Sequence, residues 1–158
     1  MTEKYLQIMI ESLEKKIKVL DQVMELNDKQ SELASHQPMD MKAFDETMEE
    51  KGKLIDEINK LNDGFSATYE LVKDDVQGNT EKYRDKVSVM QELIRTAVDK
   101  SVTVEVQEKR NKSALETVFR MKRTELKQMK KSTTAALKYY KSMSKVNYID
   151  PQLMDKKK

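Results

Sequence analysis

Residues 79–150 read NTEKYRDKVSVMQELIRTAVDKSVTVEVQEKRNKSALETVFRMKRTELKQMKKSTTAALKYYKSMSKVNYID and contain neither glycine nor proline. These two residue types interrupt regular structure more strongly than any others. A run of this length without them, with apolar residues at helical spacing, predicts one very long α-helix or two nearly continuous ones. We therefore expect an elongated helical protein, a shape suited to holding partner proteins rather than enclosing a small substrate.

The apolar positions within this run form two successive helical stripes that differ in phase. The stripes consist of Tyr83, Val87, Met90, Ile94, Ala97, Ser101 and Val104, and then of Leu115, Val118, Phe119, Lys122, Leu126, Met129, Thr133, Ala136 and Tyr140. The change of phase leaves open a bend near residues 105–112. Residues 102–106 are rich in β-branched side chains and would suit a strand, but no second strand is available to pair with them. The prediction is a helix over 80–145, followed by a mobile tail over 146–158.

The residues before this run predict two shorter helices. The first spans 3–36 and carries a coiled-coil-like seam: Leu6, Ile10, Leu13, Ile17, Leu20, Met24, Asn27, Ser31 and Ala34. Pro38 interrupts it, since proline lacks a backbone donor and disfavours helical geometry in the preceding residue. Asp40 is then placed to cap a second helix over 40–76, whose stripe is Met41, Phe44, Met48, Lys51, Ile55, Ile58 and Leu61. The loop between these helices is short, so they should be antiparallel neighbours.

Glycines mark two further positions in the second helix. Asn62-Asp63-Gly64 leaves a kink near residue 63 open, because Phe65, Tyr69 and Val72 continue the helical spacing. Gly78 suits a left-handed helix end, and Thr80 suits the cap of the next helix. The fold class that follows is all-α: an elongated antiparallel helical hairpin plus a long C-terminal helix, packed as a coiled-coil-like bundle in one domain over 1–158.

Composition fits thin packing of helix on helix. The chain is 37% hydrophobic and 37% charged, which suits narrow buried stripes with wet surroundings. Residues 1–79 carry 10 Lys against 18 Asp and Glu, a net of −8, whereas residues 80–158 carry 20 Lys and Arg against 10 Asp and Glu, a net of +10. Acidic and basic helices lying side by side would explain this, and binding to nucleic acid or anionic lipid is the alternative. No helix-turn-helix or aromatic-interleaved pattern accompanies the basic residues, which disfavours nucleic acid.

Motifs for catalysis are missing from the sequence. It has no cysteine, so disulfides and thiolate metal sites are excluded, and its one histidine, His36, lies beside a loop proline. No phosphate-binding, metalloprotease or nucleophile-elbow motif occurs. No apolar run reaches the roughly 18 residues of a membrane span, and the N-terminus lacks a signal-peptide pattern. We expect a cytoplasmic protein without enzymatic activity, cofactor, metal, small-molecule substrate or membrane span.

The basic second half also carries more apolar side chains than a thin bundle is expected to cover. They are Leu115, Phe119, Leu126, Met129, Leu137, Tyr139 and Tyr140. Uncovered side chains of this kind would form a groove for a partner helix. A second copy of the chain could cover them instead, which leaves a homo-oligomer open.

The order of these features resembles the FlgN-type flagellar export chaperones. The resemblance rests on DMKAFDETMEEKGKLIDEINKL at 40–61, QEKRNK at 107–112 before a basic amphipathic helix, AALKYYK at 135–141, Asp150-Pro151, and DKKK at 155–158. It covers nearly the whole chain. The stretch at 81–111 departs from it, since its β-branched centre has no role specific to that family.

The resemblance implies a cytoplasmic chaperone of type III flagellar export. Such proteins bind helical terminal segments of hook-associated proteins, prevent premature assembly and deliver these proteins to the export gate. It further implies that residues 112–143 bind the substrate protein, through Leu115, Val118, Phe119, Leu126, Met129 and Leu137, with Tyr139 and Tyr140 facing the substrate or the export gate. Two alternatives remain: a structural coiled-coil adaptor that uses these stripes for self-association, and a FliT-type regulator and chaperone.

Overall fold

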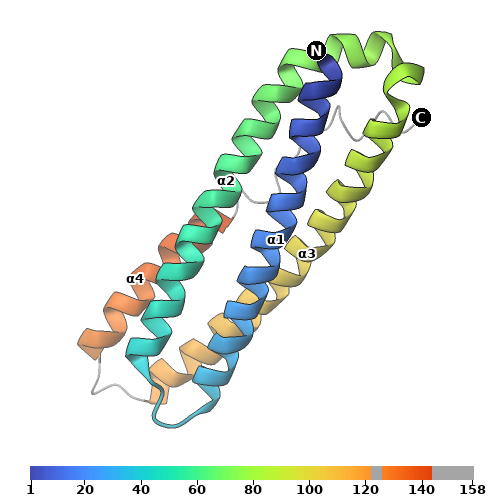
Figure 1. Ribbon diagram of the computed structural model, residues 1–158. Helices are drawn as coiled ribbons and strands as arrows, with labels where there is room; N and C mark the ends of the chain where they lie inside the picture. Colours follow the sequence, from blue (N-terminus) through green and yellow to red (C-terminus); the bar gives the residue numbers. More distant parts are fainter. Residues whose placement is uncertain (122–125, 144–158) are drawn as a thin grey trace.

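The computed structural model describes residues 1–121 and 126–143. Side chains are described for residues 1–121 and 135–143. It contains four helices: α1 (Thr2–Ser35), α2 (Met41–Gly78), α3 (Thr80–Met121) and α4 (Leu126–Met143). No strand occurs among the described residues. Figure 1 shows long helices lying side by side in an elongated bundle. The prediction of an all-α fold built on a helical hairpin is therefore confirmed.

Helix α1 lies between α2 and α3 and contacts both along its length (Figure 1). It is antiparallel to α2 and parallel to α3. Three hydrogen bonds join α1 to the residue of α3 that lies 79 positions later: Lys86 Nζ to Gln7 Oε1 (3.0 Å), Lys100 Nζ to Asp21 Oδ1 (2.7 Å) and Gln107 Nε2 to Asp28 Oδ1 (3.2 Å). The constant offset means that the two helices remain in register from one end of the bundle to the other.

The buried apolar side chains form two clusters, one in each half of the bundle. In the half that holds the N-terminus, α1, α2 and α3 enclose a cluster that includes Leu6, Tyr69 and Tyr83. In the other half, α4 joins these three helices, and the cluster includes Ile55 and Tyr139. The bundle is therefore built of three helices at one end and four at the other. Figure 1 shows α4 beside only one half of the bundle.

The predicted single helix over 80–145 is wrong. Helix α3 ends at Met121, and α4 folds back and packs against α2. Fold-back buries Ala136, Tyr139 and Met143, which a continuous helix would carry past the end of the bundle into water. The sequence has neither glycine nor proline between α3 and α4. The fold-back is therefore favoured by the burial of apolar side chains and not by a local backbone preference.

The bend left open near 105–112 is also not where α3 ends, since α3 is helical throughout this segment. The β-branched residues 102–106 lie within this helix, as expected from the sequence. Val104 faces the core, whereas Val102 and Val106 are exposed. A helix thus accounts for the alternating pattern, with one face buried and the other in water.

The helix ends agree with the sequence in part. The Asp40 carboxylate caps α2 by accepting from the Ala43 N–H at 3.1 Å, as predicted. Gly78 is the last residue of α2 and has no positive φ, so the predicted left-handed end is wrong. Asn79 ends the helix instead, with its amide donating to the Asp75 carbonyl oxygen at 3.0 Å. α2 passes through Gly64 as one helix, and the predicted tail over 146–158 lies outside the described residues.

Candidate protein-binding site

The predicted binding residues lie mostly inside the molecule. Leu115 and Val118 of α3 and Tyr139 of α4 are buried in one apolar cluster, with Phe119 and Tyr140 partly buried against it. Leu137, at 60% exposure, is the predicted contact that faces water. Leu126 and Met129 belong to α4, but their side chains lie outside the described residues. Leu115, Val118, Phe119, Tyr139 and Tyr140 therefore come together, but as a core that α4 closes and not as an open groove.

The surface that α4 covers is built from α2 and α3, and we call it the α4-binding surface. Its described residues are Met48, Glu49, Lys51, Gly52, Lys53 and Asp56 of α2 and Glu105, Glu108, Lys109 and Lys112 of α3. An open crevice runs along each side of α4. The crevice toward α2 has a volume of about 320 Å³, and the crevice toward α3 has a volume of about 300 Å³. Helix α4 is thus in contact with the bundle along a narrow strip.

A buried ion pair lies beneath α4. The Lys51 ammonium is 2.6 Å from Glu108 Oε1, and it donates to Gln30 Oε1 at 2.8 Å. The ring of Tyr139 covers the same ammonium, with 4.1 Å from Nζ to the ring centroid. The Lys51 side chain is 0% exposed and that of Glu108 is 5% exposed. We call Gln30, Lys51, Glu108 and Tyr139 the polar centre, to which each of the four helices contributes one residue.

Amides extend the polar centre toward α1 and α3. Asn111 Nδ2 donates to the Asn27 carbonyl oxygen at 2.9 Å, and Asn27 Nδ2 donates to Gln107 Oε1 at 3.1 Å. Gln30 Nε2 donates to Thr47 Oγ1 at 2.9 Å. Buried polar groups are expensive to leave without hydrogen bonds, so this network fixes the rotation and register of the helices that carry it.

Burial also sets the ionisation of the groups in this region. Desolvation lowers the pKa of Lys51 to about 8, and the nearby Glu108 carboxylate partly opposes this. Desolvation raises the pKa of Tyr139 and of Tyr140 above the ordinary range, and the charge of Glu108 raises both further. At neutral pH the polar centre therefore holds a charged lysine beneath neutral phenols.

Tyr140 connects α4 to α3. Its hydroxyl donates to the Glu108 carbonyl oxygen at 3.3 Å, and Lys112 Nζ lies 5.5 Å from its ring centroid. Its ring meets that of Tyr139 edge to face, with centroids 5.6 Å apart. The two consecutive tyrosines therefore contact the two walls of the α4-binding surface, Tyr139 at Lys51 of α2 and Tyr140 at α3.

Sequence reasoning missed the pairing of Lys51 with Glu108. A signal was present, because Lys51 occupies an apolar stripe of the second helix. Glu108 and Asn111 likewise continue the spacing from Val104 to Leu115. Opposite charges on two apolar stripes indicate a buried pair, but only the register between the helices decides which residues meet.

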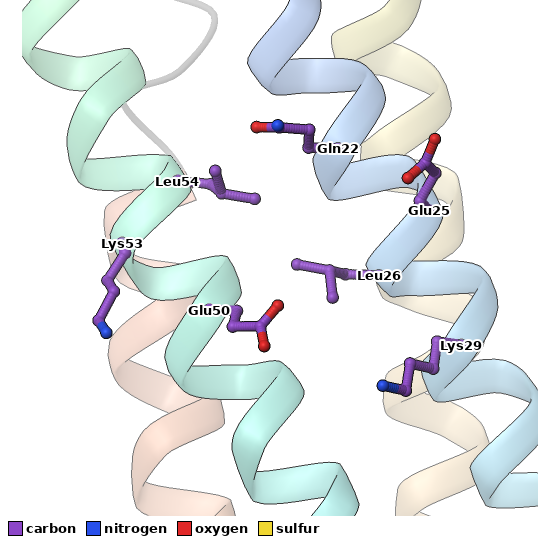
Figure 2. A pocket seen from close by; sticks show the side chains of 7 residues that line it. All are labelled: Gln22, Glu25, Leu26, Lys29, Glu50, Lys53 and Leu54. Atoms are coloured by element: carbon purple, nitrogen blue, oxygen red, sulfur yellow. The ribbon is translucent and has the colours of Figure 1, made fainter.

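A second groove lies on another face of the bundle, between α1 and α2. Its volume is about 490 Å³, and Figure 2 shows Leu26 of α1 and Leu54 of α2 pointing into the space between the helices. Charged side chains surround these two leucines. They are Glu25, Lys29, Glu50 and Lys53, with Gln22 beside them. The rim therefore carries both signs of charge, and this groove offers a matched control for experiments on the α4-binding surface.

Acidic and basic helices do lie side by side in part. Asp21 of α1 pairs with Lys100 of α3 at 2.7 Å, and Asp28 lies 3.7 Å from Arg110.

No helix in the described part of the chain is long and apolar enough to cross a bilayer. Among the same residues, no cluster of three or more His, Asp or Glu side chains could hold a metal ion. Comparisons with protein-family models, curated proteins and solved structures give no match.

Proposed function

We propose that this protein is a cytoplasmic export chaperone. It binds helical terminal segments of flagellar hook-associated proteins, prevents their premature assembly and delivers them to the export apparatus. The sequence resemblance supports the choice of partner. The observation that carries a helix-binding role is α4, a helix of 18 residues lying over a polar centre with an open crevice on each side.

The mechanism is an exchange of helices. Among the described side chains of α4, Ala136, Tyr139 and Met143 are buried, at the i, i+3 and i+7 spacing of a helix that binds in a groove. The other three helices enclose a second cluster of their own in the opposite half of the bundle. A partner helix with a similar face can therefore replace α4 while α1, α2 and α3 remain packed.

The exchange also gives a role to the predicted binding residues. Leu115 and Val118 are buried in the same apolar cluster as Tyr139. Displacing α4 exposes part of this cluster to the incoming helix and releases Tyr139 and Tyr140 to water. A chaperone of this kind keeps its apolar surface covered when no partner is bound, which limits aggregation.

Charge favours an acidic partner. Residues 109–145 include 12 basic and 2 acidic residues, and of these Lys109 and Lys112 of α3 line a crevice beside α4 and stay in place when α4 is displaced. A net positive charge along a segment raises the association rate of acidic partners. Apolar contacts would then supply most of the affinity.

Tethering α4 tests the proposal directly, because the natural chain has no cysteine. Asp56 and Ser142 line the crevice between α2 and α4, so an Asp56→Cys/Ser142→Cys variant can be joined by a short bismaleimide. Calorimetry with terminal segments of hook-associated proteins should show binding before cross-linking and little or none after it.

The matched control is a cross-link across the groove between α1 and α2. A Lys29→Cys/Glu50→Cys variant, joined in the same way, leaves α4 free and should bind as the natural chain does. Equal binding with and without the α4 tether would refute the exchange mechanism. Absence of binding in the natural chain would refute the chaperone function.

A further inference from the structure

The polar centre imposes a chemical requirement on any helix that covers it. Lys51 carries a positive charge with 0% exposure, and two of its contacts, Glu108 and Gln30, come from within the bundle. Its third contact is the Tyr139 ring, which α4 supplies. Whatever replaces α4 must therefore supply a group that is favourable next to a buried ammonium.

An aromatic ring meets this requirement and an aliphatic side chain does not. The face of an aromatic ring attracts a cation, and the attraction is strongest where water is excluded. A leucine at the position of Tyr139 would bury the ammonium without any such compensation. The difference corresponds to roughly tenfold to thirtyfold in affinity.

The neighbouring position adds a second requirement. Tyr140 reaches α3, where its hydroxyl donates to the Glu108 carbonyl oxygen and Lys112 lies over its ring. Tyr139 and Tyr140 are consecutive and lie edge to face. Two consecutive aromatic residues can thus contact α2 and α3 at the same time. The small residue Ala136 lies one turn before them and is buried against the same cluster.

We propose that the Lys51–Glu108 pair makes the α4-binding surface selective for partner helices that carry two consecutive aromatic residues one helical turn after a small residue. The partner class is an amphipathic helix of this pattern, and helices with a purely aliphatic face are rejected. This selectivity rests on the proposed exchange of α4 for a partner helix.

The test uses the full chain with its own α4 displaced. Ala136→Glu places a charge in the buried interface of α4 and should leave the α4-binding surface free. The probe is a synthetic peptide with the sequence of residues 126–143, LKQMKKSTTAALKYYKSM, because this helix is the one that the surface holds in the structure. Two altered peptides replace the tyrosine at the position of Tyr139 by Phe or by Leu.

Calorimetry should show the Tyr and Phe peptides binding within about threefold of each other, and the Leu peptide at least about tenfold more weakly. Adding Lys51→Met and Glu108→Leu to the chain should abolish this preference, because the floor of the surface is then apolar. Adding Lys16→Met should leave it intact. Lys16 is also buried, but the register between α1 and α3 places it level with residue 95, about 20 Å along α3 from Glu108.

A second measurement covers the case in which Ala136→Glu unfolds the bundle. In the otherwise natural chain, Tyr139→Leu should raise the hydrogen-exchange rate of α4 amides at least about tenfold, and Tyr139→Phe should change it by less than about threefold. The Lys51→Met/Glu108→Leu background should remove the difference between Leu and Phe. Equal effects of Leu and Phe in both experiments, or no binding of any peptide to a folded Ala136→Glu chain, would overturn the selectivity.

The outcomes separate this inference from the proposed function. Discrimination between Tyr and Leu peptides, together with no binding of hook-associated segments, would refute the chaperone function and leave the selectivity in place. Binding of hook-associated segments without discrimination between the peptides would refute the selectivity and leave the chaperone function in place.

Discussion

Removing the lysine of the polar centre should destabilise the bundle strongly. In Lys51→Met, the Glu108 carboxylate loses the ammonium at 2.6 Å while its side chain remains about 95% buried, since it is 5% exposed in the natural chain. Gln30 also loses a donor at 2.8 Å. Breaking a buried pair by removing one partner costs about 3–5 kcal/mol in the free energy of unfolding. This is a large part of the 5–15 kcal/mol that typically stabilises a protein.

Replacing both partners should restore most of this loss. In Lys51→Met/Glu108→Leu the same space is filled by apolar side chains, and no charge remains without a partner. Replacing a buried ion pair in this way is often neutral or stabilising. We expect the free energy of unfolding of the double variant to lie within about 1–2 kcal/mol of that of the natural chain.

Urea denaturation followed by helical circular dichroism measures both variants, provided that the slope with denaturant stays the same. Lys53→Met is the matched control, because Lys53 lies two residues away on α2 and is exposed. It should change the free energy of unfolding by no more than about 0.5 kcal/mol. If Lys51→Met costs less than about 1 kcal/mol, or if the double variant is no more stable than the single one, the account of the polar centre is wrong.

Three further predictions follow from the same structure. First, the free energy of unfolding should rise as the pH increases from about 7.5 to 9.5, because burial lowers the pKa of Lys16 and Lys51 to about 8 and the unfolded chain then holds more protons than the folded one. It should fall again above about pH 10, where unfolded tyrosines ionise while burial keeps Tyr139 and Tyr140 neutral; urea denaturation across this pH range measures both limbs. Second, Asp40→Ala should lower the free energy of unfolding by about 1 kcal/mol, because it removes the acceptor for the Ala43 N–H, with Asp56→Ala on an exposed position of α2 as the control in the same denaturation assay. Third, raising the salt concentration from about 50 to 500 mM should slow association with an acidic partner helix in stopped-flow measurements and change dissociation less, because salt screens the exposed basic residues and not the buried contacts.

Each of these has a result that would contradict it. A flat or falling stability between pH 7.5 and 9.5 would mean that the two buried lysines keep their ordinary pKa. Equal stability of the two aspartate variants would remove the role assigned to the cap. A salt effect confined to the dissociation rate would mean that the basic residues act within the bound interface and do not accelerate association of the partner.

The sequence by itself determined the helices of this protein and most of their ends. The heptad-like spacing and the absence of glycine and proline after Asn79 predict long helices, and Pro38 with Asp40 predicts where the hairpin turns. These signals are local, since a cap or a helical stripe depends on residues within one or two turns. They place α1 and α2 within a few residues of their observed ends, and they put Leu115, Val118 and Ala136 on one predicted apolar face.

The tertiary structure decided where that face goes and what lies beneath it. Fold-back of α4 depends on the burial of Tyr139 against α2, and this gain exists only once α2 and α3 are packed around α1. The meeting of Lys51 with Glu108 depends on the register of two helices that are far apart in the sequence. Helical periodicity fixes the face on which a residue lies but not its partner across the bundle, so the polar centre and the covering of the predicted groove emerge from packing alone.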